Sequence, residues 1–375
     1  RNEKTNTITH YNLRMHVLNL PVFYLPYLSH PDWTVRRRSG FLTPSFLISS
    51  DFGFTPSISY FQVIDDTKDA QFNLYKYQYR GAAVKTNYRQ LWDQSVFQAN
   101  IYAARVETYK ADREAVGAVD ASFTSSIGDD WDINTRLVRS SQDTFLRRYK
   151  FNTETSLKSS ATAERIVSDR YYYVEASDRQ SLTTANKNTN EPTILPHVFY
   201  EKIKKGWRPQ QQLRTEISAL QLDNDQDHDY ARWSSVFEIA EDIPLTQGVG
   251  NYNASLMANY YEIHSQSSTA STKLGTVAHT NPSISLGWRM PVAITGFGRM
   301  AIIEPKAQVT YVGGNDRTGD IPNRDAAEYR IDEANLFLPH RYQGKDYILP
   351  GTRVDAGIGT TANDHYLGNV AAFAG

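Results

Sequence analysis

Apolar and polar residues alternate along much of this 375-residue chain, with a period of two. Between Ser283 and Met290, for example, Ile284, Leu286 and Trp288 alternate with small or polar residues. Because successive side chains of a strand point to opposite faces, such a stretch predicts a strand with one apolar and one polar face. The stretches with the clearest alternation are Val119–Ile127, Arg232–Ile239, Ser283–Met290 and Lys306–Tyr311.

Other segments alternate less cleanly but have similar lengths, many of about 9–11 residues, which a tilted strand needs to cross a bilayer. These segments are Phe41–Ser50, Phe54–Ile64, Gln71–Arg80, Ala82–Leu91, Val96–Glu107, Trp131–Ser140, Thr155–Val167, Tyr171–Leu182, Arg208–Leu222, Asn251–His264 and Thr352–Thr361. Roughly 16 strands are too many for one soluble sandwich and suit a large barrel. No stretch predicts an amphipathic helix longer than a turn or two.

Two segments rich in turn-forming residues interrupt the pattern. Gly313–Gly351 carries many Gly, Pro, Asp and Asn residues and predicts a long surface loop, and Thr183–Pro196 is similar. Long loops on one rim and short turns on the other are typical of outer-membrane barrels. The pattern therefore favours an all-β, antiparallel transmembrane barrel.

The first part of the chain differs from the rest. Leu13–Leu20 predicts a short apolar strand, and Pro21 and Pro26 follow it five residues apart. Proline cannot donate a ladder hydrogen bond, so this segment is expected at an edge or a junction. We place a domain boundary between His30 and Ser39, where polar residues interrupt the pattern.

Composition narrows the class. The chain holds 24 Tyr, 16 Phe and 6 Trp but only 40% hydrophobic residues, a balance that suits a barrel with a wet interior and aromatic girdles. The 40 basic and 41 acidic residues give no excess that would indicate nucleic acid. Cysteine is absent, which excludes disulfides and thiolate sites within the chain. No apolar run is long enough for a transmembrane helix. Arg1 is no initiator residue, so we expect a mature or excised fragment.

No constellation of residues predicts catalysis, and we expect neither a metal nor a cofactor. Asp223–Asp229 has acids at alternate positions but lacks the glycine and terminal glutamate of a calcium loop, so a polar turn is favoured over an ion site. The nine histidines show no ligand spacing, and no Gly-x-Ser-x-Gly elbow occurs.

Two separated strings of residues carry a family resemblance. The first comprises Pro21–Tyr27, His30–Asp32 and Arg37–Pro44, and the second comprises Ile303–Gln308, Asn335–Phe337 and Arg341–Asp346. Both strings, in this order, resemble the LptD (OstA) family of LPS-assembly proteins. Between them the resemblance rests mainly on the strand pattern.

The resemblance implies a periplasmic β-jelly-roll followed by an outer-membrane barrel of about 26 strands, the upper end of the usual range. In this chain it implies the end of the jelly-roll and the junction in residues 1–35, and in residues 36–375 a barrel that lacks its last strands. The implied partners are lipopolysaccharide, outer-membrane lipid, an LptE-like lipoprotein plug and an LptA-like periplasmic bridge. The implied location is the outer membrane of a Gram-negative cell, with the N-terminal part in the periplasm.

The resemblance also assigns sites. Pro44 and Pro56 match the prolines of the family's lateral gate, and a proline weakens pairing because it lacks an N–H group. Without the resemblance, both would be expected merely to end strands near turns. The junction residues are Pro21, Tyr24, Pro26, Arg37, Arg38, Ser39, Gly40 and Phe41.

Two further groups keep alternative interpretations. Arg36, Arg37 and Arg38 either contact lipopolysaccharide phosphates or form a solvated turn, which charge runs usually do. The apolar set Val17, Leu18, Leu20, Val22 and Phe23 either lines an acyl-chain slide or packs in a core.

The predicted function is insertion of lipopolysaccharide into the outer leaflet through a gate beside the first strands, without catalysis. A passive porin-type channel, which needs a sealed seam, is the first alternative. An outer-membrane lipid hydrolase, which needs a Ser–His pair on one rim, is the second.

Overall fold

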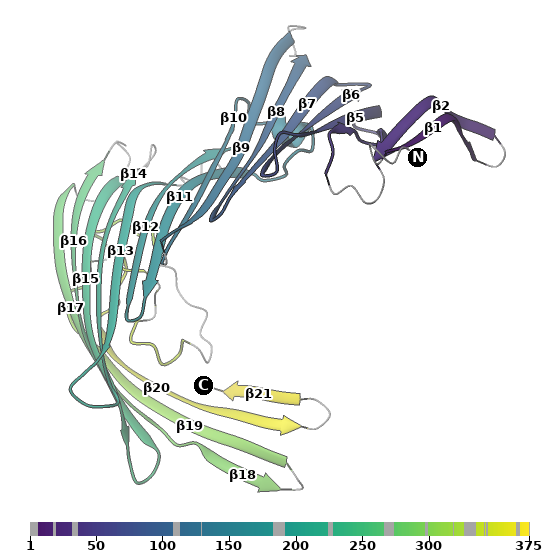
Figure 1. Cartoon of the computed structure of the whole chain (residues 1–375). Coiled ribbons are helices and arrows are strands. Elements are labelled where there is room, and N and C mark those ends of the chain that lie inside the picture. Colours follow the sequence, from purple (N-terminus) through teal and green to yellow (C-terminus); the bar gives the residue numbers. More distant parts are fainter. Residues whose placement is uncertain are drawn as a thin grey trace. The chain divides into compact units, whose positions relative to one another are not determined.

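In the described residues of the computed structural model, the regular structure is antiparallel β-strand apart from one helical turn, which confirms the predicted all-β class (Figure 1). Among them, no helix has the length and apolar character to cross a membrane. The structure describes residues 7–17, 20–31, 37–107, 113–128, 130–182, 192–223, 228–265, 274–296, 299–317, 319–325, 335–340, 342, 344–364 and 368–374.

The chain forms two compact units. The first unit comprises Arg1–Ile127, Ile133–Ser159 and Gln180–Asn186, and the second comprises Gly128–Asp132, Ser160–Arg179 and Lys187–Gly375. Three strands divide their residues between the units: β10 (Trp131–Ser140), β11 (Ser156–Val167) and β12 (Arg170–Ser181).

In the first unit, β1 and β2 pair only with each other, and β3 to β9 form an antiparallel series. Both β3 and β4 pair with β5, and each later strand pairs with the one before it. The strands are β1 (Thr7–Val17), β2 (Leu20–Pro31), β3 (Gly40–Phe41), β4 (Ser45–Ser49), β5 (Gly53–Val63), β6 (Lys68–Tyr77), β7 (Gly81–Trp92), β8 (Ser95–Glu107) and β9 (Arg113–Ile127).

The second unit continues the meander from β13 onward. Here β17 and β18 follow each other along one side of β19, because both pair with it. The strands are β13 (Thr193–Lys205), β14 (Gln211–Asp223), β15 (His228–Pro244), β16 (Val249–Ser265), β17 (Gly275–Arg289), β18 (Val292–Gly296), β19 (Arg299–Val312), β20 (Gly351–Asp364) and β21 (Gly368–Ala374).

In the central strands of both units, large apolar side chains lie on the exposed face and polar ones on the covered face. In β17, Leu286 is 58% exposed while Ser285 is 3% exposed. In β6, Phe72 and Leu74 are nearly half exposed and Asn73 between them is buried. A water-soluble sheet has the opposite arrangement, with its apolar face covered.

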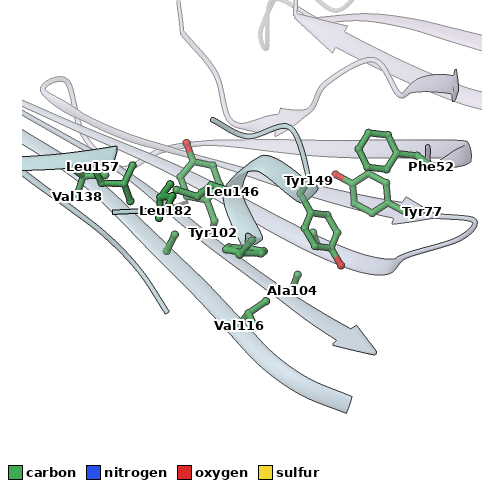
Figure 2. Close-up of a cluster of buried hydrophobic side chains, with 13 residues drawn as sticks. Phe52, Tyr77, Tyr102, Ala104, Val116, Val138, Leu146, Tyr149, Leu157 and Leu182 are labelled. Atoms are coloured by element: carbon green, nitrogen blue, oxygen red, sulfur yellow. The ribbon is translucent and has the colours of Figure 1, made fainter. Parts of the chain in front are cut away.

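Two small apolar clusters lie among these strands. In the first unit, the loop between β10 and β11 carries the one-turn helix α1 (Phe145–Arg148), whose Phe145 and Leu146 pack with Tyr77, Tyr102 and other residues (Figure 2). In the second unit, Tyr230, Tyr261 and Ile263 form the centre of the other cluster.

The predicted strands lie where the structure has strands, with a few corrections. Leu13–Leu20 is no single strand, because β1 ends at Val17 and β2 begins at Leu20. The predicted loop Thr183–Pro196 was wrong at its end, since Thr193–Pro196 belongs to β13, which we did not expect. Its residues 183–191 lie outside the described part. The described residues between Val312 and Gly351 are turns and irregular chain, which confirms the long loop.

Candidate functional site

Arg37 fastens the junction to the turn between β5 and β6. Its guanidinium donates to the backbone carbonyls of Asp66 (2.6 Å) and Lys68 (3.2 Å) and to the Asp69 carboxylate (2.7 Å). Arg89 donates to both oxygens of that carboxylate, at 2.8 and 2.9 Å. Arg37 is therefore held by protein groups, while Arg36 lies outside the described residues.

The next junction residues continue this attachment. Arg38 donates to the Thr7 hydroxyl at 2.6 Å. The Ser39 hydroxyl accepts the N–H of Val63 at 2.8 Å, and β3 then pairs Gly40 with Phe61. The chain thus enters the first unit's sheet beside a short turn.

Pro21, Tyr24 and Pro26 all lie in β2. Tyr24 is exposed and donates to the Asn12 side chain at 2.8 Å. The ladder pairs Tyr11 with Tyr27 and Leu13 with Leu25, whereas Asn12 and Pro26 between them do not form a ladder pair. Asn12 has a left-handed φ of 56°. Of the apolar set proposed for an acyl-chain slide, Leu18 lies outside the described residues, and nothing is described of the side chains of Val17, Leu20, Val22 and Phe23.

Pro44 lies at a break in the first hairpin. The ladder pairs Phe41 with Tyr60 and resumes at Ser45 with Ser57, so three residues face two. This is the geometry of a β-bulge, which locally disrupts pairing. The Leu42 N–H still reaches the Ser59 carbonyl at 2.8 Å. Beyond the bulge, Phe46, Leu47 and Ile48 of β4 are all more than half exposed.

Pro56 lies where the β5–β6 ladder ends. That ladder runs from Val63 with Asp69 to Ser57 with Tyr75, although β6 continues to Tyr77. Proline has no N–H to donate, which gives a reason for the end of pairing. Pro56 also pairs with Phe46 in the β4–β5 ladder, so pairing is interrupted on its β6 side, whereas Pro44 lies at the bulge itself.

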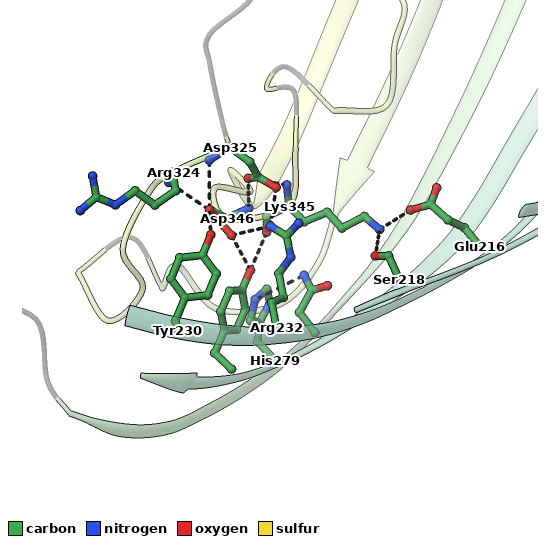
Figure 3. Close-up of polar contacts among 11 residues, drawn as sticks. Glu216, Ser218, Tyr230, Arg232, His279, Arg324, Asp325, Lys345 and Asp346 are labelled. Carbon is green, nitrogen blue, oxygen red and sulfur yellow. Dashed lines mark hydrogen bonds and ion pairs between the residues drawn. The ribbon is translucent and has the colours of Figure 1, made fainter. Parts of the chain in front are cut away.

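A second site, which we did not predict, joins the long loop after β19 to the covered face of the second unit. Arg232 of β15 donates to Asp346 at 2.6 Å and also to Asp325 (Figure 3). Asp346 additionally accepts the hydroxyls of Tyr230 (2.8 Å) and Tyr261 (3.1 Å). The Asp346 side chain is fully buried, so its carboxylate is shielded from water and depends on these protein groups for hydrogen bonds.

The two acids also tie the loop to itself. Asp325 accepts the N–H groups of Lys345 and Asp346, each at 3.0 Å, and Asp346 accepts those of Arg324 and Asp325. The Lys345 ammonium donates to Glu216 and, at 2.8 Å, to Ser218 on β14. Two loop segments about twenty residues apart are thus joined in one cluster of hydrogen bonds and ion pairs, the loop cluster (Figure 3).

Burial and neighbouring charges shift the pKa values of these loop groups in opposite directions. Burial alone would raise the pKa of Asp325, but Arg232 and the two N–H groups outweigh it and the pKa is lowered. Burial raises the pKa of Asp346 despite Arg232. Burial lowers the pKa of Lys345, and Glu216 opposes that shift. Most of these charges offset one another, as a buried ionic cluster requires.

The described residues of both sites offer hydrogen-bond donors, acceptors and ion pairs. In the described part of the chain, no three His, Asp or Glu side chains are grouped to hold a metal ion. Most of the Asp223–Asp229 segment lies outside the described residues. The sequence feature that could have pointed to the loop cluster is the string Arg341–Asp346. That string did not identify Arg232 as the partner of Asp346.

Comparisons with known proteins agree on one family. The family model for "LptD: LPS transport system D" matches residues 114–368. LPS-assembly protein LptD of Shewanella oneidensis is 23% identical over 95% of this chain and 47% of its own length. The Haemophilus ducreyi protein of that name is 22% identical, with 93% and 48% covered.

This chain thus spans about half the length of the relatives that it matches. A solved bacterial polysaccharide outer membrane secretin aligns with 70% of this chain and 85% of its own, at 12% identity and a TM-score of 0.29, which is too low to carry an argument. The family model covers well over half of the residues, so this chain belongs to the LptD family, described as LPS transport system D.

Proposed function

We propose that this chain is part of an outer-membrane protein that inserts lipopolysaccharide into the outer leaflet. Family membership carries this proposal, since the relatives are named LPS-assembly proteins. The family name describes transport and assembly, so no catalytic step is proposed. Lipopolysaccharide would be the cargo, and the energy would come from outside the chain.

The distribution of side chains supports a place in a membrane. Exposed apolar residues such as Ile217, Phe237 and Leu286 would face lipid, and buried polar residues would face the inside of a barrel. In lipid every backbone polar group needs a partner, so a spanning sheet has to close on itself. We therefore propose a barrel in residues 36–375 that closes with further strands of the protein.

The first hairpin is proposed as the lateral gate. Pro44 lies at a bulge and Pro56 at the end of a ladder, and each removes a possible backbone hydrogen bond. Pairing beside them is therefore weaker than in an unbroken ladder. Acyl chains would leave through this seam, while the sugar portion passes inside the barrel.

The proposed partners follow from the same family membership. Residues 1–35 would belong to a periplasmic jelly-roll that receives lipopolysaccharide from an LptA-like bridge. An LptE-like lipoprotein would occupy the barrel interior. The attachment of Arg37 to the short turn after β5 supports a periplasmic position for that rim, because outer-membrane barrels have short periplasmic turns.

In-cell photocrosslinking tests this function. A photoreactive residue at Ser45, beside Pro44, is expected to give adducts with lipopolysaccharide when transport is active. The matched control is Val354 of β20, which is also exposed but lies far along the chain. Adducts at both positions or at neither, in cells that export lipopolysaccharide normally, would contradict a gate at the first hairpin.

A further inference from the structure

Two cations lie over one aromatic ring at the tip of the first hairpin, where β4 turns into β5, and a third stands close by in the sequence. The Lys150 ammonium lies 5.3 Å from the centre of the Phe52 ring, and the Arg80 guanidinium lies 5.5 Å from the same ring. Arg148 belongs to α1, two residues before Lys150. Its neighbour in the chain, Tyr149, belongs to the same buried aromatic cluster as Phe52.

Buried aromatic side chains pack next to these cations. Phe52 and Tyr149 are each 2% exposed, and Tyr77 packs between them with ring centres 5.0 and 5.2 Å away (Figure 2). The Tyr149 hydroxyl donates to the Arg80 carbonyl at 2.9 Å. Lys150 has a left-handed φ of 56°, which is costly for a residue with a side chain.

In the described contacts of this cluster, the two cations Arg80 and Lys150 adjoin one acidic residue, Asp51. It pairs with Lys150 at 2.6 Å, and its carbonyl accepts from Arg80 at 3.2 Å. Both partners of that ion pair are about half exposed, so it is weak and can exchange for another anion. Glu154, the last acid of the same loop, pairs with Arg136 instead.

Exposed apolar side chains belong to the same strand ends and turns. Ile48, Phe54 and Tyr79 are each at least half exposed, and the Phe54 N–H donates to the Gln78 side chain in the turn that also carries Arg80. Cations at the end of an exposed apolar surface match a lipid whose headgroup carries phosphate. Arginine binds phosphate through two parallel hydrogen bonds, and lysine adds a mobile point charge.

We propose that Arg80, Arg148 and Lys150 form a binding site for the phosphate groups of a lipid at the tip of the first hairpin. This site rests on the proposed function, in which that lipid is lipopolysaccharide arriving in the outer leaflet. Phosphate takes the place of the Asp51 carboxylate on Lys150 and also binds the Arg80 guanidinium. The hairpin tip then exchanges an internal ion pair for contacts with the cargo.

Binding of lipid A to the purified full-length protein in detergent tests the site. Bisphosphorylated lipid A, dephosphorylated lipid A and sodium phosphate are titrated separately and followed by microscale thermophoresis. Wild type is expected to prefer the bisphosphorylated form about tenfold or more, because charge-assisted hydrogen bonds are the stronger ones. The triple variant Arg80→Gln, Arg148→Gln, Lys150→Asn is expected to lose that preference, and asparagine tolerates the left-handed φ.

A second variant and a control complete the design. Asp51→Asn is expected to tighten binding about threefold, since it removes the competing anion. Replacing Lys204, Lys205 and Arg208 with Gln removes the same charge elsewhere and should leave the preference unchanged. An unchanged preference in the triple variant would overturn the site, as would sodium phosphate that binds as tightly as the lipid. Wild type that binds neither lipid A would instead count against the proposed function.

Discussion

The guanidinium of Arg232 lies 2.6 Å from a carboxylate oxygen of Asp346, a residue 114 positions later in the chain. Both side chains are almost completely buried, and Asp325 shares the same guanidinium. This contact holds the long loop after β19 on the polar face of β15. In the proposed barrel, where that face lines the interior, the loop would occupy part of the interior.

Removal of Arg232 should destabilise the protein strongly. In Arg232→Met, the buried Asp346 and Asp325 lose their shared cation, and such losses cost about 3–5 kcal/mol. The measurement is the free energy of unfolding of the full-length protein in lipid vesicles, by urea titration. The control Arg208→Met, whose side chain is 66% exposed, should cost less than about 1 kcal/mol.

The double variant Arg232→Met, Asp346→Leu should be more stable than Arg232→Met alone. It removes one of the two acids that the single variant leaves buried without a cation. If the double variant is the less stable of the two, this ion pair is not what holds the loop.

Acid should release the loop only at low pH. The pKa of Asp325 is lowered from its usual 3.8, so its contribution is present above that value and is lost as pH falls through the lower, folded value. The pKa of Asp346 is raised by burial, so protonation of Asp346 comes first and relieves a buried charge. Protection of the Lys345 and Asp346 N–H groups against hydrogen exchange should therefore persist from about pH 7 to about pH 4.

The variant Asp325→Asn supplies the control for this titration. It should lower the protection factors of Lys345 and Asp346 at every pH, because the neutral amide oxygen accepts both N–H groups less strongly than the carboxylate does. Protection in the wild type that declines already near pH 6 would assign the pH response to other groups.

The period of two made the strands predictable. Trp131–Ser140 was predicted and found with the same bounds, because an alternating segment with one covered face can pair in only one register. The strand β13 was missed because Thr193–Pro196 follows an Asn/Thr-rich stretch and contains proline, both typical of loops.

The loop cluster was missed for a different reason. Arg232 stands at a polar position of an alternating strand, where any charged residue would fit the pattern equally well. Its partners come from a loop that returns after four further strands, and periodicity contains no information about where a long loop returns. The prolines of the first hairpin were predicted as weak points from their chemistry, whereas their role as a gate stays a prediction.

Arg37→Gln should loosen the turn after β5. The substitution removes two hydrogen bonds to turn carbonyls and one ion pair to Asp69, in a side chain about one-third exposed. We expect a local loss of about 1 kcal/mol, seen as faster hydrogen exchange at residues 64–69. Arg89→Gln leaves the carbonyl contacts intact and should have a smaller effect. If Arg37 mainly contacted lipopolysaccharide phosphate, exchange would stay unchanged while lipid binding fell.

Replacing a proline of the first hairpin should slow export of lipopolysaccharide. Pro56→Val restores an N–H group where the β5–β6 ladder ends, so pairing can extend toward Lys76 and Tyr77. One added hydrogen bond is worth about 1 kcal/mol, which corresponds to a several-fold lower population of the open seam. Pro44→Val should act in the same direction at the bulge. Arrival of newly made lipopolysaccharide at the cell surface, measured after a pulse label, is expected to slow several-fold.

The matched control is Pro282→Val, because Pro282 has the same local pairing as Pro56 but lies in the second unit, not on the first hairpin. It pairs with Leu256 on one side, and on the other side the β17–β19 ladder ends next to it, at Ser283. Export should be unaffected there at equal protein levels. Normal export in both Pro44→Val and Pro56→Val would mean that opening at this hairpin does not limit transport. Equal slowing in all three variants would instead trace the effect to assembly of the protein, since a loss of folded molecules reduces export wherever the proline lies.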